Sequence, residues 1–437
     1  MKLRYGFLAG LMLFAQPVVA TETVEMADWL SPTIVDGSNY GIYPTDFYLN
    51  ATEPIGDIQL DELIENVTQK LANLSLTIDE NWLEGETFVA QTRADVVNRL
   101  FNSVAIYKEV TATSAVDYFV ENELLLGDYD GLRLDDFCTT VEALTLATRF
   151  INHMHSEFEA GSKGLAWQVQ NNGNTVYLLG SIHIGTPDLY PINQKLEQAF
   201  LESDTLVVEA NILSDNQEEM LYFMQVMMYE EGSLLDDIDD EMYLKIEQAS
   251  EKIGIPTQDL LMYKPWALGN TLELFSMLID EDGEDIKQAM GIDAYYLGKA
   301  MEYEKEIVEL EGIINQAEFF NNLSLGGQLE YLDLTIDSIL NPAEVSNGEI
   351  FNTWIDYWVQ GDIEGFREMM EIDTTTEVGQ MLIGKRDKEM AQKISQMLET
   401  EGENTYFVVV GAAHLLSDGT VIDNLEGYGY NVELFYQ

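Results

Sequence analysis

The segment "NTVYLLGSIHIGTPDLYP", residues 174–191, is an apolar β-type run that ends in a glycine, with a histidine three residues further on. Residues 404–419, "NTYFVVVGAAHLLSDG", repeat this pattern, so that His183 follows Gly180 as His414 follows Gly411. Two of the four histidines in the chain therefore share one local context. Both runs are continuously apolar, which is typical of central strands covered on both faces. If the two strands are neighbours, both imidazoles lie at one edge of a sheet.

The sequence around these two runs predicts an α/β fold. Further short segments rich in β-branched or aromatic residues occur at 165–170, 204–210, 305–310 and 431–437. The first is joined to 175–180 by "NNGN", a hairpin signal. Helical periodicity covers 191–202, 216–230, 237–252, 286–304 and 386–399. Alternating strands and helices indicate a central sheet with flanking helices, and the repeated motif suggests two pseudo-symmetric halves.

The part of the chain before this α/β region has a different pattern. Residues 21–160 read as mainly helical, with apolar residues at three- and four-residue spacing. A small, polar linker, "EAGSKG" at 159–164, separates them from an α/β domain over 164–437. His153 and His155 lie two apart on a predicted helix and so point to different sides, and we expect both at the surface. The role of residues 21–160 is not legible from the sequence.

The first twenty residues have the features of a secretory signal peptide. Lys2 and Arg4 precede an apolar stretch at 7–14, and Val18-Val19-Ala20 resembles a cleavage site. No later segment is long and apolar enough to span a bilayer. The single cysteine, Cys138, excludes an intramolecular disulfide framework and a thiolate-rich zinc site, and it is most simply a buried apolar side chain. We expect a periplasmic or extracellular protein.

The charge of the chain is strongly acidic. Its 78 acidic and 21 basic residues give a net charge of −57. Nucleic acid is excluded as a partner, because phosphate backbones are bound by Lys and Arg patches. So large a carboxylate excess suits a solvated surface in a salty exterior, where self-repulsion is screened, better than a dedicated cation store. The sequence does not indicate an oligomeric state.

The two Gly-x-x-His motifs become chemically meaningful together with Glu209. This residue ends the apolar run "DTLVVEA", so its carboxylate should reach the same sheet edge, either as a metal ligand or in a salt bridge. Two imidazoles and one carboxylate with open coordination positions suit a divalent Mn, Fe, Co or Zn ion. Such an ion lowers the pKa of a bound water towards neutrality. His183, Glu209 and His414 are thus candidate ligands.

Several motifs in one order give the chain a resemblance to the TraB/GumN family. They are "TVYLLGSIHIGTPDLYP…LVVEANI", "GIDAYYLGKA", "IVELEGIINQAEFF" and "GKRDKEMAQKISQML…YFVVVGAAHLLSDG", and together they cover about 164–437. Two Gly-x-x-His motifs with a Glu between them are the hallmark of that family. The resemblance implies a fold related to erythromycin esterase and ChaN proteins. It also implies a His183, Glu209 and His414 metal site, because TIKI members of the family behave as metal-dependent peptidases.

The resemblance also singles out Asp293 in "GID", Glu311 in "ELEG", and Arg386 with Asp387 in "KRD". Asp293 is a candidate site residue, although it would equally cap a helix. Glu311 ends its strand as Glu209 does, which suggests a supporting carboxylate or a base. Arg386 lies in a basic segment of a cation-poor chain. It would either hold a substrate carboxylate or oxyanion, or pair with the acidic surface.

These features support three hypotheses. The first is an exported metal-dependent hydrolase, most simply a peptidase acting on a peptide or an exposed protein segment. The second is a non-catalytic protein that sequesters a peptide in the same cleft, because no one-piece protease motif such as H-E-x-x-H is present. The third is a scaffold whose N-terminal region makes the partner contacts. It would be favoured if the two Gly-x-x-His loops lay far apart.

Overall fold

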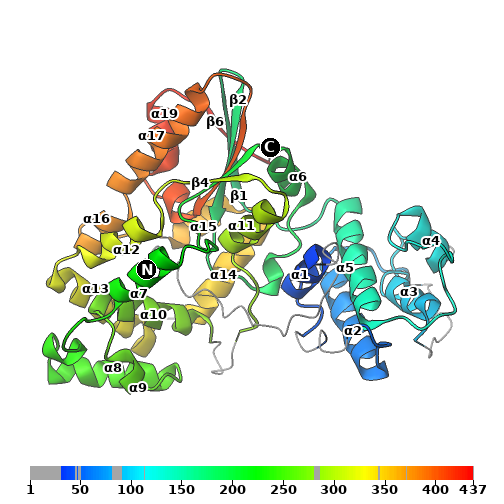
Figure 1. Cartoon of the computed structure of the whole chain (residues 1–437), viewed down its shortest axis with the longest axis horizontal. Coiled ribbons are helices and arrows are strands. Elements are labelled where there is room, and N and C mark those ends of the chain that lie inside the picture. Colours follow the sequence, from blue (N-terminus) through cyan, green and yellow to red (C-terminus); the bar gives the residue numbers. More distant parts are fainter. Residues whose placement is uncertain are drawn as a thin grey trace. The chain divides into compact units, whose positions relative to one another are not determined.

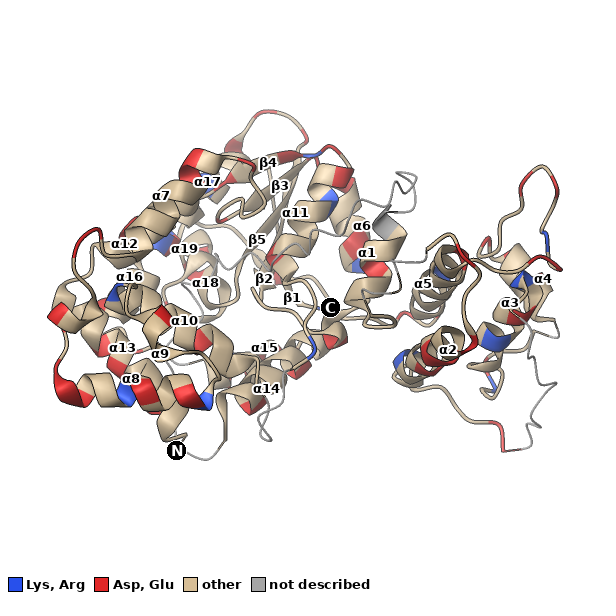
Figure 2. Cartoon of the chain, turned by 60° about the horizontal axis from the view of Figure 1, so that its bottom comes forward, with Lys and Arg blue, Asp and Glu red and all other residues tan. Residues whose placement is uncertain are grey.

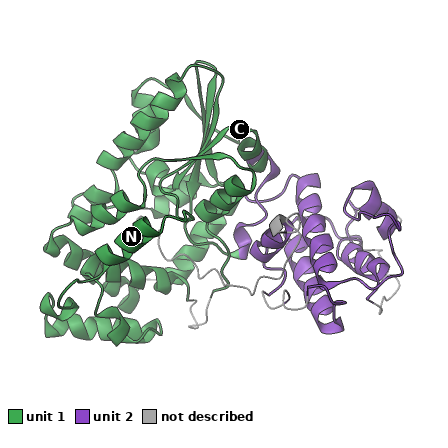
Figure 3. Ribbon diagram, viewed as in Figure 1, with its two compact units in different colours: residues 1–17, 163–186, 197–437 green, residues 18–162, 187–196 purple. Residues whose placement is uncertain are grey.

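The computed structural model describes residues 31–436 apart from 45–46, 48–50, 81–90, 113, 280–285, 343–344 and 371. These residues form two compact units (Figure 3). One unit contains residues 163–186 and 197–436 and includes the whole sheet, and the other contains the described residues up to 162 together with 187–196. The predicted signal peptide, residues 1–20, lies outside the described residues.

The first unit is built on a six-stranded sheet with the order β4-β3-β5-β2-β1-β6. The strands are β1 (Leu165–Asn171), β2 (Asn174–Ser181), β3 (Thr205–Val208), β4 (Glu306–Glu309), β5 (Thr405–Gly411) and β6 (Val432–Leu434). β1 and β2 form the hairpin expected from "NNGN", with Asn171 opposite Asn174. The turn residues Asn172 and Gly173 both have positive φ, 51° and 89°, as a tight two-residue hairpin turn requires.

Four adjacent strands of the sheet, β4, β3, β5 and β2, run parallel. β5 lies between β2 and β3, with Ser181 opposite Gly411 and Val208 opposite Val409. β4 continues the parallel set, with Glu309 opposite Val208. The residues that follow β2, β3, β4 and β5 therefore emerge at one edge of the sheet. This confirms that the strands of the two Gly-x-x-His motifs are neighbours and that the fold is α/β, whereas two pseudo-symmetric halves stay a prediction.

Helices cover both faces of the sheet (Figure 1). On one face lie α6 (Gln194–Glu202) and α11 (Ile292–Glu302). They meet at Phe407 of β5, whose ring centroid is 5.6 Å from that of Phe200 and 4.8 Å from that of Tyr296. On the other face lie α17 (Lys385–Glu399) and α19 (Val421–Gly427). Asn174 of β2 donates to the Leu398 carbonyl of α17 at 3.1 Å. Burial on both faces explains why the central strands are uniformly apolar.

A layer of further helices packs against the carboxyl edge of the sheet. These are α7 (Gln217–Met227), α8 (Asp240–Lys252), α9 (Thr257–Leu260), α10 (Pro265–Met277), α12 (Ile313–Asn321), α13 (Leu325–Leu340), α14 (Asn347–Gln360), α15 (Ile363–Met369), α16 (Glu377–Leu382) and the short α18 (Ala413–Leu416). Nearly every residue of α10 is buried, and its Trp266 stacks on Phe320 of α12 at 5.4 Å. The same apolar cluster includes Ala210 and Ala413, which follow β3 and β5, so this layer closes over the strand ends.

The second unit is helical, with α1 (Ser31–Asn39), α2 (Asp57–Ala72), α3 (Arg93–Asn102), α4 (Ala115–Glu121) and α5 (Thr140–Glu157). α5 begins with a reciprocal capping box between Thr139 and Glu142 and contacts α1, α2 and α3. Its Phe150 stacks on Phe119 of α4 at 4.9 Å. Cys138 is fully buried, as expected for a small apolar side chain.

One sequence-based expectation for this unit is wrong. His155 is buried rather than exposed, because it lies on the inner face of α5, and its Nδ1 is 2.9 Å from the Ile151 carbonyl. Burial lowers the pKa of His155 to about 4. His153 points to another side and lies 2.8 Å from the Tyr118 hydroxyl. The expectation that both histidines are exposed was wrong because helix α5 is buried over most of its circumference.

Acidic residues are spread over the helices of both units (Figure 2). Lys and Arg are few and scattered in the same view, in keeping with the net charge of −57. None of the helices in the described part of the chain is both long enough and apolar enough to cross a bilayer.

Candidate metal and catalytic site

The two repeated histidines meet at the carboxyl ends of β2 and β5, and each is held through the same ring nitrogen. His183 follows β2, and its Nδ1 lies 2.7 Å from Asp293 Oδ2. His414 lies in α18 directly after β5, and its Nδ1 is 3.0 Å from Asp387 Oδ1. A neutral imidazole that donates Nδ1–H to a carboxylate presents the lone pair of Nε2, the arrangement found for histidine ligands of metals. Both residues therefore have Nε2 available for a third group.

Glu209, which follows β3, lies between the two imidazoles. Its Oε1 accepts a hydrogen bond from the Gly411 backbone N–H at 2.5 Å and is 3.7 Å from His414 Nε2. A β-carbon built at Gly411 would lie 3.3 Å from Glu209 Oε1 and 3.3 Å from His183 Nε2. Glu209 Oε1 and His183 Nε2 are therefore no further apart than the sum of these two distances. Only a residue without a side chain leaves this space open. The edge of the sheet thus brings His183, Glu209 and His414 together, as the sequence predicted.

Arg386 and Glu311 hold the other side of the Glu209 carboxylate. Arg386 of α17 donates to both Glu311 oxygens, at 2.8 and 2.6 Å, and to Glu209 Oε2 at 3.3 Å. Gln316 of α12 donates to both glutamates, at 3.0 and 3.2 Å. Burial raises the pKa of Glu311, but the Arg386 guanidinium outweighs burial and lowers it overall. Arg386 thus pairs with the buried carboxylates of Glu209 and Glu311 and not with carboxylates on the acidic surface.

Asp293 has a different role from helix capping. Helix α11 begins at Ile292 with Gly291 at its N-cap, which makes no side-chain capping hydrogen bond. Instead Asp293 accepts a hydrogen bond from the Ser181 hydroxyl at 2.8 Å and holds His183. Burial raises the pKa of Asp293, but the adjacent His183 outweighs burial and lowers it. Ser181, at the end of β2, thereby fixes the carboxylate that orients the first histidine.

The charges of the site are unbalanced. Four buried carboxylates, Glu209, Asp293, Glu311 and Asp387, face the single guanidinium of Arg386 in the hydrogen-bonded network of described residues. Burial lowers the pKa values of His183 and His414, but the nearby carboxylates, chiefly Asp293 and Glu209 respectively, raise them overall. The site therefore attracts positive charge, either as protons on the imidazoles or as a cation.

The donor chemistry fits a divalent ion. Two imidazole Nε2 atoms and one carboxylate form a donor set that Mn, Fe, Co and Zn all accept, and two positive charges would offset most of the local excess. Among the described residues, no three His, Cys, Asp or Glu side chains are already gathered as a closed ligand set. The three donors would have to move closer together around an ion.

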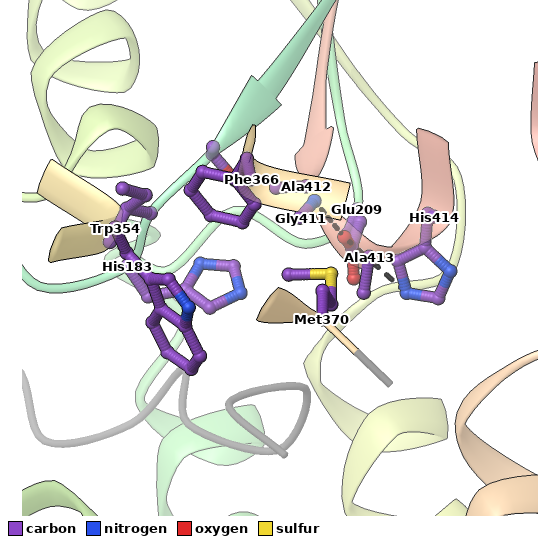
Figure 4. A pocket seen from close by; sticks show the side chains of 11 residues that line it. His183, Glu209, Trp354, Phe366, Met370, Gly411, Ala412, Ala413 and His414 are labelled. Atoms are coloured by element: carbon purple, nitrogen blue, oxygen red, sulfur yellow. Dashed lines mark hydrogen bonds and ion pairs between the residues drawn. The ribbon is translucent and has the colours of Figure 1, made fainter. Parts of the chain in front are cut away.

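A pocket of about 420 Å³, part of it open to solvent, lies over these residues. It is lined by His183, Glu209 and His414 together with an apolar wall formed by Trp354, Phe366 and Met370 (Figure 4). Sequence reasoning missed this apolar wall, because its residues come from α14, α15 and the residue after α15 and have no pattern that separates them from core residues. It also missed Gln316.

Comparison with known proteins identifies the family of this chain. The profile of the TraB/PrgY/gumN family matches residues 165–434. The chain belongs to this family. The matched residues begin with β1 and end in β6, and therefore contain the whole sheet and every residue of the site.

Relatives within the TraB/PrgY/gumN family are distant. The chain is 23% identical to the uncharacterized protein YbaP of Escherichia coli over 245 residues, which are 56% of this chain and 85% of YbaP. It is 24% identical to a metalloprotease TIKI homolog of Nematostella vectensis over 306 residues, 59% of this chain and 64% of the homolog. Metalloprotease TIKI1 of Xenopus tropicalis is 43% identical over 53 residues, 12% of this chain and 10% of TIKI1. No solved structure gives a match.

Proposed function

We propose that this protein is an exported metal-dependent hydrolase that cleaves peptides or exposed protein segments. The observation that carries the proposal is the pairing of two histidines from adjacent parallel strands, each held at Nδ1 by its own buried carboxylate, around Glu209. The relatives named as TIKI metalloproteases support it. The hydrolase hypothesis requires the two Gly-x-x-His loops to be adjacent, whereas the scaffold hypothesis does not.

In this proposal His183, Glu209 and His414 hold a divalent metal. When bound, the ion would supply Lewis acidity and lower the pKa of a water molecule. Asp293 and Asp387 pair with Nδ1 of the two imidazoles, which fixes the orientation of each ring and leaves Nε2 to bind the ion. Arg386 and Gln316 donate to Glu209 Oε2, which directs Oε1 towards His414. Glu311, which Arg386 holds beside Glu209, or another carboxylate would carry the proton during hydrolysis.

One property of the sequence supports export. The charged and apolar start of the chain, residues 1–20, has the pattern of a signal peptide. We propose a periplasmic or extracellular location. Fractionation of cells that express the full chain, with immunodetection and N-terminal sequencing, would test it, and the full chain retained inside the cell with its first twenty residues would contradict it.

Metal content and peptide cleavage together test the enzymatic proposal. Gently purified protein should contain a stoichiometric divalent metal by elemental analysis and should cleave members of a peptide library in a chelator-sensitive manner. His183→Ala and His414→Ala should each lose the metal and the cleavage, because each removes one of three ligands. His153→Ala, which removes a partly exposed imidazole of the helical unit, is the matched control. Full metal content and activity in His183→Ala would refute the assignment.

A second candidate is peptide sequestration without cleavage. It is favoured by the state of Glu209, whose two oxygens already accept three hydrogen bonds from Gly411, Gln316 and Arg386. A carboxylate satisfied in this way is stable without a metal. Tight binding of a peptide to metal-supplemented protein, with no new fragments by mass spectrometry, would favour this function over hydrolysis.

A further inference from the structure

Helix α14 carries two tryptophans, Trp354 and Trp358, and among the described residues only the indole N–H of Trp358 has an acceptor. Trp358 donates to the Gly180 carbonyl at 2.7 Å, which ties α14 to the end of β2. Trp354, one helical turn earlier, lines the pocket and is only 2% exposed. Its Nε1 has no hydrogen-bond partner in the described part of the chain. A buried donor without an acceptor is unfavourable, and in a pocket wall it is a position where a ligand acceptor would bind.

The wall around this N–H group is apolar. Trp354 stacks on Phe366 of α15, with ring centroids 6.0 Å apart and an interplanar angle of 23°. Met370 is a further apolar residue of the lining. Figure 4 shows the indole of Trp354 on the same side of the pocket as the imidazole of His183. One pocket thus combines an apolar wall, one unused N–H donor and the polar cluster of the candidate metal site.

We propose that this wall is a specificity subsite that takes an apolar side chain of a peptide substrate close to the bond that is cleaved. The Trp354 N–H then donates to a backbone carbonyl of the same peptide. The inference rests on the proposed peptidase function and adds the substrate class to it. A peptide offers a carbonyl acceptor next to an apolar side chain, which matches the pairing of donor and wall.

Two features of the site refine the proposal. Trp354 Nε1 is buried in this structure, so a side chain of the apolar wall must move before a substrate carbonyl can reach it. Met370, an unbranched thioether side chain with three rotatable bonds, is the lining residue best suited to move. The excess of buried carboxylates in the polar part of the pocket disfavours acidic side chains. Apolar residues should therefore be preferred, and Glu-containing peptides should be the poorest substrates.

Cleavage of a defined peptide set tests the subsite. Metal-loaded protein is incubated with blocked Ala-Gly peptides that carry a single Leu, Phe, Ser or Glu at each position in turn, and kcat/KM is measured. We expect Leu or Phe near the cleaved bond to be favoured over Ser by roughly tenfold or more. Trp354→Phe keeps the ring and removes the donor, and should lower kcat/KM for the best peptide by roughly two- to tenfold.

Trp266→Phe is the matched control. Trp266 Nε1 is also buried without a partner in the described residues, but Trp266 stacks on Phe320 in the helical core and does not line the pocket. This variant should cleave the peptides as the unaltered protein does. Cleavage without side-chain preference, or an equal loss in both variants, would overturn the subsite while leaving the hydrolase intact.

Binding gives a readout that does not depend on turnover. Calorimetric titration of the same peptides into the His183→Ala protein should show the Leu or Phe preference and its weakening by Trp354→Phe. If peptides bind with this preference but no fragments form with metal-loaded protein, the proposed hydrolase fails and the subsite stands. If no peptide in the set binds or is cleaved, the subsite is refuted as well.

Discussion

Replacement of Arg386 by methionine tests the organisation of the site most directly. The guanidinium is 4% exposed and is the cation shared by Glu209 and Glu311, which are themselves almost fully buried. Methionine preserves much of the side-chain volume and removes the charge. Among the described residues, both carboxylates would then share only the Gln316 amide as a side-chain donor, with like charges close to each other.

The size of the effect follows from the hydrogen bonds that are lost. Arg386 makes three charge-assisted bonds to the two carboxylates. Loss of one partner from a buried ion pair lowers stability by about 3–5 kcal/mol, because the remaining charge stays buried without compensation. The pKa of Glu311, now lowered by Arg386, should rise in the variant. Protonation then relieves the repulsion, so the loss should be larger at about pH 8 than at about pH 5.

Urea denaturation followed by tryptophan fluorescence measures this loss. Four of the six tryptophans, at positions 167, 266, 354 and 358, belong to the unit that contains the site. Lys385→Met is the matched control, because Lys385 precedes Arg386 on α17 but is 87% exposed in its pair with Glu389. This control should leave the transition essentially unchanged. A loss below about 1 kcal/mol for Arg386→Met, the range of exposed ion pairs, would refute the reasoning.

Three further predictions concern the core and the site. Burial raises the pKa of Glu273 from 4.5 to about 7, although the Tyr331 hydrogen bond lowers it. Ionisation of Glu273 in the folded state therefore lowers the free energy of unfolding as the pH rises from about 4.5 to 7. Above pH 7 the full loss is at most about 3 kcal/mol. Glu273→Gln should therefore be more stable than the unaltered protein at about pH 8 and nearly equal to it at about pH 5 in thermal melts. An equal difference at both pH values would contradict this. Asp387→Asn should weaken metal binding by about ten- to a hundredfold in chelator competition, because His414 loses the carboxylate that orients it; unchanged affinity would exclude His414 as a ligand. Phe407→Ala should lower the free energy of unfolding by about 3–5 kcal/mol, because β5 is buried on both faces; a loss below about 1 kcal/mol would show that the sheet interior repacks easily.

The sequence predicted the parts of this molecule that depend on local pattern. The continuous apolar runs before His183 and His414 identified two central strands, because strands buried on both faces need apolar residues at every position. Residues 171–174 predicted the hairpin for a similar reason, since a two-residue turn with positive φ favours Asn and Gly. The position of Glu209 at a strand end then followed from parallel topology. Each of these features depends on a few residues that are close together in the sequence.

Features that depend on distant contacts could not be predicted from residue pattern. Gln316 and the apolar wall of Trp354, Phe366 and Met370 reach the site from separate helices, and their side chains look like ordinary helix residues in sequence. His155 was placed at the surface because its burial depends on how α1, α2 and α3 enclose α5. Asp293 resembled a helix cap because it stands in the first turn of α11, and only the position of β2 shows its contact with His183.

The position of β5 between β2 and β3 bears on the order of events during biosynthesis. Gly411 and Glu209, which bond across this junction, are 202 residues apart in the chain. A nascent chain that has not yet reached β5 has two open strand edges in the middle of its sheet and only one of the two imidazoles. The unbroken sheet and the full set of candidate metal ligands therefore form only late in synthesis, and under the proposed function an incompletely synthesised chain would be inert towards other polypeptides in the compartment where it is made.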